Sequence, residues 1–131
     1  MATAAPAELS PREHRELDRA QDLAAQGQLA EAIALAREVA DRNPGVAEAQ
    51  FITAELAYRV SRWSDAVTYF RRGGDPGEDQ PLRLFYLAVC LYEAGDRDHA
   101  AVAFRRSLPS LRRTSYVESY VTKILGSTTR P

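Results

Sequence analysis

Small and apolar residues recur along this chain at a fixed interval of 34 residues. Two of the recurring columns contain only alanine: Ala20, Ala54 and Ala88, and then Ala32, Ala66 and Ala100. Three more columns follow the same interval: Gly27, Ser61 and Gly95; Ala36, Phe70 and Phe104; and Arg37, Arg71 and Arg105. A constant period of this length is typical of a protein built from stacked structural repeats. The chain of 131 residues has room for three of them.

Each repeat is predicted to be a pair of antiparallel helices, and residues 84–104 contain the most regular pair. Ala88 and Ala100 lie on either side of a turn at Gly95, and their small side chains allow two helices to approach closely. Large residues such as Leu84 and Phe104 then fill the space around the contact. Because one hairpin cannot bury its own apolar face, about three have to stack to form a continuous core.

Caps and breakers predict where the helices begin and end. Ser10 is the expected cap of the first helix, with Pro11 at its first position and Glu13 completing a capping box. Pro109 is expected to end or kink the sixth helix near residue 108. The earlier helices are expected at 10–26, 29–42, 46–60 and 63–72.

Three repeats and a final helix account for most of the chain. The repeats are expected at 13–46, 47–80 and 81–114, within one domain at 10–126. Ser115 and Glu118 have the spacing of a second capping box, which predicts a capping helix at 115–126. Residues 1–9 are expected to be disordered and 127–131 to form a flexible tail. The glycine-rich octet 73–80 is the best candidate for a hinge.

This pattern resembles the tetratricopeptide repeat (TPR) family, whose 34-residue signature is W-x2-L-G-x2-Y, then A-x3-F and a closing proline. The third repeat matches it at Leu84, Leu87, Ala88, Leu91, Ala100 and Phe104. The first two repeats have polar residues at the opening aromatic and leucine positions: Glu16, Arg19, Gln50 and Thr53. The resemblance implies an all-α fold, a right-handed superhelical solenoid of three helix hairpins plus a C-terminal capping helix.

In TPR proteins the first helices of the hairpins line a concave groove that binds a protein or peptide partner. The resemblance therefore implies a non-catalytic scaffold or adaptor whose groove is lined by Leu17, Gln21, Phe51, Ile52, Glu55, Tyr58, Phe85, Tyr86, Val89 and Tyr92. Family members that grip a chain terminus use several Lys and Asn side chains, whereas this chain has only Lys123 and Asn43, both elsewhere. The aromatic lining favours an apolar or helical peptide segment. Alternatively, some of these aromatics are core, and the capping helix or a second copy fills the groove.

Charge is distributed unevenly along the chain. Residues 1–46 carry five arginines against eight acids, and residues 47–80 carry four against six. Residues 81–131 carry seven arginines and one lysine against four acids, so the net charges are −3, −2 and +4. This gradient is compatible with an ordinary solvated surface or with head-to-tail contacts in a homo-oligomer. A self-associating assembly component is therefore an alternative function, and a chaperone for apolar segments is another.

Residues with catalytic or metal-binding chemistry are sparse and scattered. The two histidines, His14 and His99, belong to no ligand pair or catalytic triad spacing. Cys90 is the single cysteine, and its apolar neighbours indicate a buried thiol. We therefore predict no enzyme activity, no catalytic or metal site and no cofactor.

Nucleic acid and membranes are also not expected partners. The recurring arginines form a stripe that could follow phosphates, but a pI of about 6.1 lacks the usual basic footprint. No apolar run approaches the roughly 18 residues that span a bilayer. The N-terminal residues do not resemble a secretory signal, so the chain is expected to be cytoplasmic.

Overall fold

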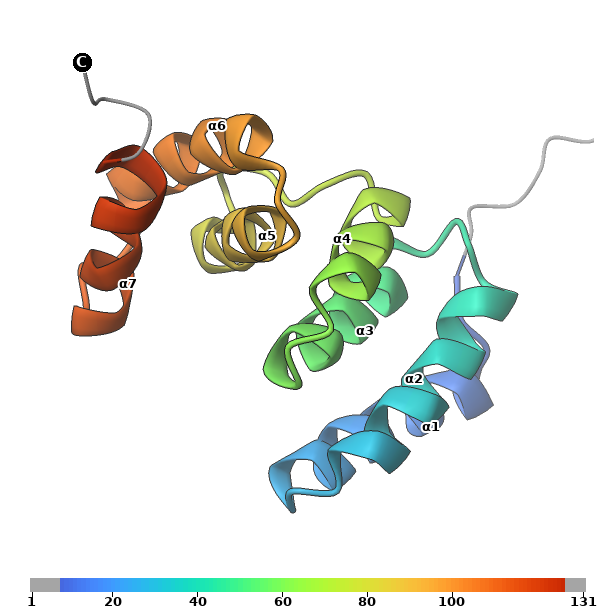
Figure 1. Cartoon of the computed structure of the whole chain (residues 1–131). Coiled ribbons are helices and arrows are strands. Elements are labelled where there is room, and N and C mark those ends of the chain that lie inside the picture. The colour runs from blue at the N-terminus through green and yellow to red at the C-terminus, as the bar shows by residue number, and fades with distance from the viewer. Residues whose placement is uncertain (1–7, 127–131) are drawn as a thin grey trace, which may run out of the picture.

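A computed structural model of the protein describes residues 8–126, which form three helix hairpins followed by a short helical cap. The hairpins are α1 (Pro11–Ala25) with α2 (Leu29–Arg42), α3 (Ala47–Arg59) with α4 (Trp63–Arg72), and α5 (Pro81–Glu93) with α6 (Arg97–Ser107). The cap consists of a 3₁₀ turn η1 (Leu108–Ser110), α7 (Ser115–Tyr120) and the π-helical turn η2 (Val121–Gly126). Figure 1 shows the hairpins side by side in chain order, with no strand among residues 8–126. The predicted all-α solenoid is confirmed.

The recurring small residues lie at the helix contacts, as the sequence predicts. Every alanine of the two alanine columns is fully buried, with an exposed fraction of 0%. Phe70 and Phe104, which follow in the same register, are buried to the same extent. Removing this apolar surface from water is the main force that holds each hairpin together and joins it to the next.

The turns inside the three hairpins have the same hydrogen bonds. The amide of the residue after each turn donates to a carbonyl five residues earlier: Gln28 to Leu23 (2.9 Å), Arg62 to Ala57 (2.9 Å) and Asp96 to Leu91 (2.8 Å). This geometry requires a positive φ at the turn, where Gly27 and Gly95 have 83° and 95°. Ser61 takes φ 61° at the equivalent position, a conformation that costs an L-residue about 1 kcal/mol.

The polar residues at signature positions of the second repeat are buried and hydrogen-bonded. Gln50 is fully buried, and its amide donates to the carbonyls of Ala40 (2.9 Å) and Asn43 (3.0 Å). The hydroxyl of Thr53 donates to the carbonyl of Ala49 (2.9 Å). Gln50 thereby fixes the connection between the first two hairpins, although its Oε1 atom has no partner among the described residues.

The two predicted capping boxes have different outcomes. The first is confirmed: the Glu13 amide donates to Ser10 Oγ and the Ser10 amide to Glu13 Oε1, both at 3.1 Å. The second is wrong by one residue, because the extended Thr114 is the cap and accepts from the Val117 amide at 3.2 Å. Glu118 instead pairs with Arg113.

The segments predicted to be loose contain packed residues where the structure describes them. Leu9, in the segment predicted to be disordered, is 8% exposed and belongs to the core. In the predicted hinge, Pro76 is buried, and a side chain at Gly73 would lie 2.4 Å from the Phe51 ring. Residues 1–7 and the predicted tail 127–131 lie outside the described residues.

The cap continues the register of the solenoid. α6 ends at Ser107, before Pro109, as predicted. α7 begins at Ser115, 34 residues after Pro81 at the start of α5, so it takes the position of a fourth first helix. Its buried residues Val117 and Tyr120, with Ile124 of η2, cover the end of the apolar core.

Candidate functional site

The ten predicted groove residues lie on the first helices α1, α3 and α5, but they do not form one continuous open surface. Leu17, Gln21 and Ile52 line a hollow between α1 and α3. Phe85 and Tyr86 line another hollow near α7. The other five are buried in the core or engaged by neighbouring side chains, as described below.

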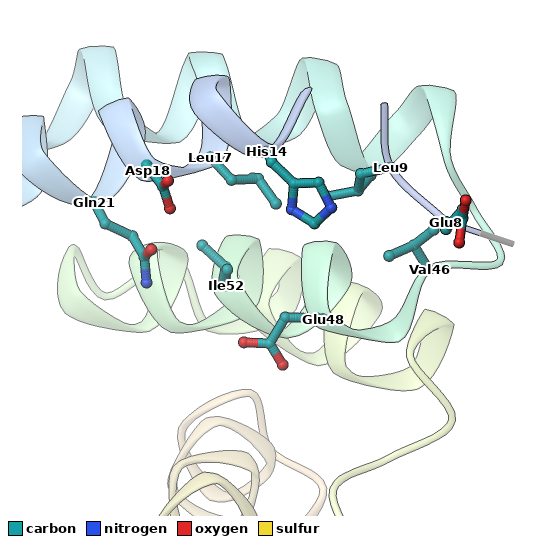
Figure 2. A pocket seen from close by; sticks show the side chains of 9 residues that line it. All are labelled: Glu8, Leu9, His14, Leu17, Asp18, Gln21, Val46, Glu48 and Ile52. Carbon is teal, nitrogen blue, oxygen red and sulfur yellow. The ribbon is translucent and has the colours of Figure 1, made fainter. Parts of the chain in front are cut away.

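The α1–α3 hollow has a volume of about 340 Å³ and is lined by Glu8, Leu9, His14, Leu17, Asp18, Gln21, Val46, Glu48 and Ile52. Figure 2 shows the side chains of Leu17 and Ile52 facing each other between the two helices. These two residues are 4% and 7% exposed, so they form an apolar floor. Asp18 and Gln21 lie toward one end of the hollow, and Glu8 lies toward the other (Figure 2).

Arg83 connects α3 to α5 across the middle of the concave side. Its guanidinium donates to both carboxylate oxygens of Glu48, at 2.8 and 2.9 Å, and also pairs with Glu55. Burial raises the pKa of the predicted groove residue Glu55, and the Arg83 charge opposes that shift. The hydrogen bonds from Arg83 lower the pKa of Glu48. Arg83 therefore occupies the centre of the predicted groove with an internal ion-pair network.

The C-terminal part of the predicted groove is covered by tyrosines of α7. The Phe85 ring is 1% exposed and meets Tyr116 and Tyr120 edge to face, at centroid distances of 5.8 and 6.1 Å. The Tyr92 ring lies 6.2 Å from the same Tyr120. The Tyr120 hydroxyl donates to Glu93 at 2.8 Å. The capping helix therefore fills this region, which is one of the alternatives left open by the sequence.

Tyr58 joins α3 to the cap. Its ring stacks on Tyr86 at a centroid distance of 4.4 Å, and its hydroxyl lies 2.6 Å from the Tyr116 hydroxyl. Burial and the Tyr116 contact both raise the pKa of Tyr58. The remaining predicted groove residues, Phe51 and Val89, are 5% and 0% exposed, which places them in the core.

The second hollow, between α5, the 108–114 segment and α7, has a volume of about 380 Å³. We call it the α5–α7 hollow, and it is lined by Pro81, Leu82, Phe85, Tyr86, Ser110, Leu111, Arg112, Thr114, Tyr116 and Val117. Leu82 and Tyr116 are 51% and 46% exposed, which makes them unusually accessible for large apolar side chains. This hollow is mostly apolar, with Arg112 as its only charged lining residue.

The residues with possible chemistry have structural roles. Cys90 is buried, and burial raises the pKa of its thiol to about 12, so the reactive thiolate is not populated near neutrality. His99 is exposed and pairs with Asp96 at 2.8 Å on its own helix start. Residues 8–126 contain no cluster of three metal-ligating side chains. Within the same range, no helix combines the length and apolarity needed to cross a membrane.

Many recurring arginines link neighbouring segments of the solenoid. Arg72 pairs with Asp41 at 2.8 Å and Arg106 with Glu78 at 3.1 Å, in both cases between successive repeats. Arg37 donates to the Tyr69 hydroxyl at 3.3 Å. These contacts account for the arginine stripe without a nucleic acid partner.

The sequence prediction missed His14, Asp18 and Glu48 of the α1–α3 hollow. The 34-residue interval contains the signal that would have found them. Asp18 lies in the same column as the predicted residues Ile52 and Tyr86, and His14 and Glu48 share a second column. Leu9 carries no such signal, because it precedes the first repeat.

Comparison with known proteins agrees with this architecture. The tetratricopeptide repeat family matches residues 17–79, and a second tetratricopeptide repeat match covers residues 84–108. No curated protein matches the chain. The two matches cover 63 and 25 residues, or 88 of the 131. With the 34-residue register, the buried alanine columns and the three equivalent turns, they establish that the chain belongs to the tetratricopeptide repeat family.

Proposed function

We propose that the protein is a non-catalytic adaptor that holds an apolar, helical segment of a partner protein on its concave side. TPR proteins are in general protein–protein interaction modules. The observation that carries this proposal is the α1–α3 hollow, where Leu17, Gln21 and Ile52 line an open space of about 340 Å³.

The composition of the hollow suits one or two apolar side chains of an amphipathic helix. Leu17 and Ile52 supply the apolar contact, and the exposed side chains of Gln21 and His14 stand at its border. A helix laid into such a groove inserts its residues at i, i+3 and i+4 and leaves its polar face in water. Gains in affinity come mainly from the few side chains that become fully buried.

Titration with fluorescently labelled amphipathic peptides tests this proposal by anisotropy. In the Gln21→Trp variant the indole would occupy the border of the hollow, and we expect the affinity to fall roughly tenfold or more. The matched control is Asp22→Trp, which changes an equally exposed neighbour that does not line the hollow. Equal binding by the protein and the Gln21→Trp variant would exclude the α1–α3 hollow as the binding site.

Self-association is a second candidate, favoured by the exposed apolar residues Leu82 and Tyr116 at the basic end of the chain. A contact between this end of one copy and the acidic beginning of the next would be heterologous and would form open chains. Light scattering at two protein concentrations and two salt levels tests it. The mass should rise with concentration and fall with salt if opposite charges hold the copies together. A constant monomer mass would exclude this candidate.

A further inference from the structure

Carboxylates lie at both ends of the α1–α3 hollow, with apolar side chains between them. Figure 2 shows Asp18 toward one end and Glu8 toward the other, on either side of Leu17 and Leu9. Three of the nine lining residues are acidic, and none is lysine or arginine. The hollow therefore combines an apolar floor with a negative border.

The two end carboxylates are not neutralised by the protein's own arginines. Between neighbouring elements, acidic side chains are commonly paired, as Glu13 is with Arg42 (3.3 Å) and Asp41 with Arg72 (2.8 Å). Within residues 8–126, by contrast, neither Asp18 nor Glu8 makes an ion pair or a side-chain hydrogen bond. Both are exposed, so their charges act on whatever enters the hollow.

The third acid of the lining has a different role. Glu48 extends from α3 away from α1 in Figure 2, and it accepts two hydrogen bonds from Arg83 of α5. Its charge is thus balanced toward the centre of the molecule. The net negative character of the hollow comes from Asp18 and Glu8 at its ends.

Resting on the function proposed above, we infer that the α1–α3 hollow selects a cationic amphipathic helix. Its leucine-like side chains pack on Leu17 and Ile52, and lysine or arginine side chains flanking them pair with Asp18 and Glu8. Opposite charges across an interface favour the correct partner and accelerate association, whereas like charges oppose binding. An acidic helix with the same apolar face would place carboxylates beside Asp18 and Glu8, so it is rejected.

Two synthetic peptides with the same leucine positions test this selection. One carries lysine and arginine at its polar positions, and its twin carries glutamate there. We expect the full chain to bind the cationic peptide roughly tenfold or more tightly in a fluorescence anisotropy titration at low salt. The difference should shrink at about 1 M salt, because exposed charges are then strongly screened.

Reversal of one charge makes the test local. Asp18→Lys is expected to weaken binding of the cationic peptide by roughly tenfold and to strengthen binding of the acidic twin. Asp22→Lys is the matched control, because it makes the same change on the same helix at an exposed residue that does not line the hollow. It should change either affinity by less than about threefold. Circular dichroism of both variants checks that the helices remain folded.

The outcomes separate this inference from the proposed function. Equal binding of the two peptides, or tighter binding of the acidic twin, would overturn the cationic selection while leaving a peptide-binding hollow. Equal effects of Asp18→Lys and Asp22→Lys would also overturn it, since net charge alone would then explain them. Binding of neither peptide would contradict both. Concentration-dependent self-association that Asp18→Lys abolishes would identify a second copy as the occupant, which overturns a separate partner helix.

Discussion

The two ends of the concave side are built from the same repeat but are occupied differently. Between α1 and α3, the buried side chains of Leu17 and Ile52 form the floor of an open hollow with unpaired carboxylates at its ends. Between α5 and α7, Tyr116 and Tyr120 of the protein itself pack on Phe85. Equivalent positions in a repeat protein thus have different roles, depending on the element that follows them.

The comparison shows how much a neighbouring helix decides. Leu17 and Phe85 belong to the same 34-residue column, so the repeat alone assigns them one role. Phe85 contacts Phe104 from its own hairpin in addition to the two tyrosines of the cap. A large aromatic side chain so enclosed contributes mainly to folding, and any partner site at this end is limited to the more exposed residues around it.

The largest expected effect is that of Phe85→Ala. Because the ring is 1% exposed and packed on three aromatic neighbours, its removal should lower the free energy of unfolding by about 3–5 kcal/mol. Urea denaturation followed by circular dichroism measures this change. Leu82→Ala on the same helix, at a residue that is 51% exposed, is the control and should cost less than about 1 kcal/mol. Similar small losses for both would mean that Phe85 is not core.

Arg83→Met tests the ion-pair network between the two regions. The methionine keeps part of the stem but leaves half-buried Glu55 without its cation, so we expect a loss of about 1–3 kcal/mol near pH 7. Burial already raises the pKa of Glu55, and loss of the arginine should raise it further. A carboxyl with a raised pKa in the folded state loses stability as pH rises, so the deficit should be smaller near pH 4.

The control for this variant is Arg59→Met at an exposed position at the end of α3. It should change the free energy of unfolding by less than about 0.5 kcal/mol at either pH. A deficit in Arg83→Met that stays constant between pH 7 and pH 4 would contradict an unpaired Glu55 as its cause.

Ser61→Gly is expected to stabilise the hairpin that both regions share. Its positive φ of 61° is unfavourable for serine, while glycine occupies the equivalent turns of the outer hairpins. Relief of this strain, reduced by the greater freedom of glycine when unfolded, should add about 0.5 kcal/mol. Thermal denaturation should show a higher midpoint. Ser64→Gly, inside α4, is the opposite control and should destabilise by a similar amount.

Tyr116→Phe separates the hydroxyl contact with Tyr58 from the packing of the cap. The contact is 2.6 Å long and exposed, so its loss should cost no more than about 0.5–1 kcal/mol. It should also bring the raised pKa of Tyr58 closer to its ordinary value, as measured by ultraviolet titration. Tyr58→Phe and the double variant complete a cycle in which the two losses should not add. Additive losses would mean that the hydroxyls do not interact.

The smallest effect concerns acid stability at the N-terminal end. A hydrogen bond from Asn43, together with the Ser10 amide, lowers the pKa of Glu13 from 4.5 to about 2. A carboxyl with a lowered pKa stabilises the folded state above its unfolded pKa and loses that contribution as pH falls toward 2. The difference in denaturation midpoint between the protein and Glu13→Gln should therefore be constant above about pH 5.5 and shrink below it. A difference independent of pH would contradict this role of the charge.

The fold was largely predictable from the sequence because its determinants are local and periodic. The alanine columns, the turn positions and the Ser10 cap depend on spacing along the chain, and the structure confirms them. The shift of the last cap from Ser115 to Thr114 is an error of one residue at a helix end, where neighbouring hydroxyl residues compete for the same amide.

The candidate site was predicted only in part, because its outcome depends on contacts between distant segments. The first-helix positions were identified, but spacing could not show that Tyr116 would reach Tyr58 across 58 residues. Nor could it show that Arg83 would bridge Glu48 and Glu55. Asp18 was within reach of the sequence, since it shares the register of Ile52, but a polar residue in an otherwise apolar column was overlooked.

The start of α7 in the register of α5 also bears on how the rod can be lengthened. A copy of residues 81–114 inserted before Ser115 would present the terminal helix with the same preceding hairpin that it covers now. Only one junction would be novel, where the copied first helix meets α6. The molecule is in this sense an extensible tandem array, with a terminus already shaped for one more module.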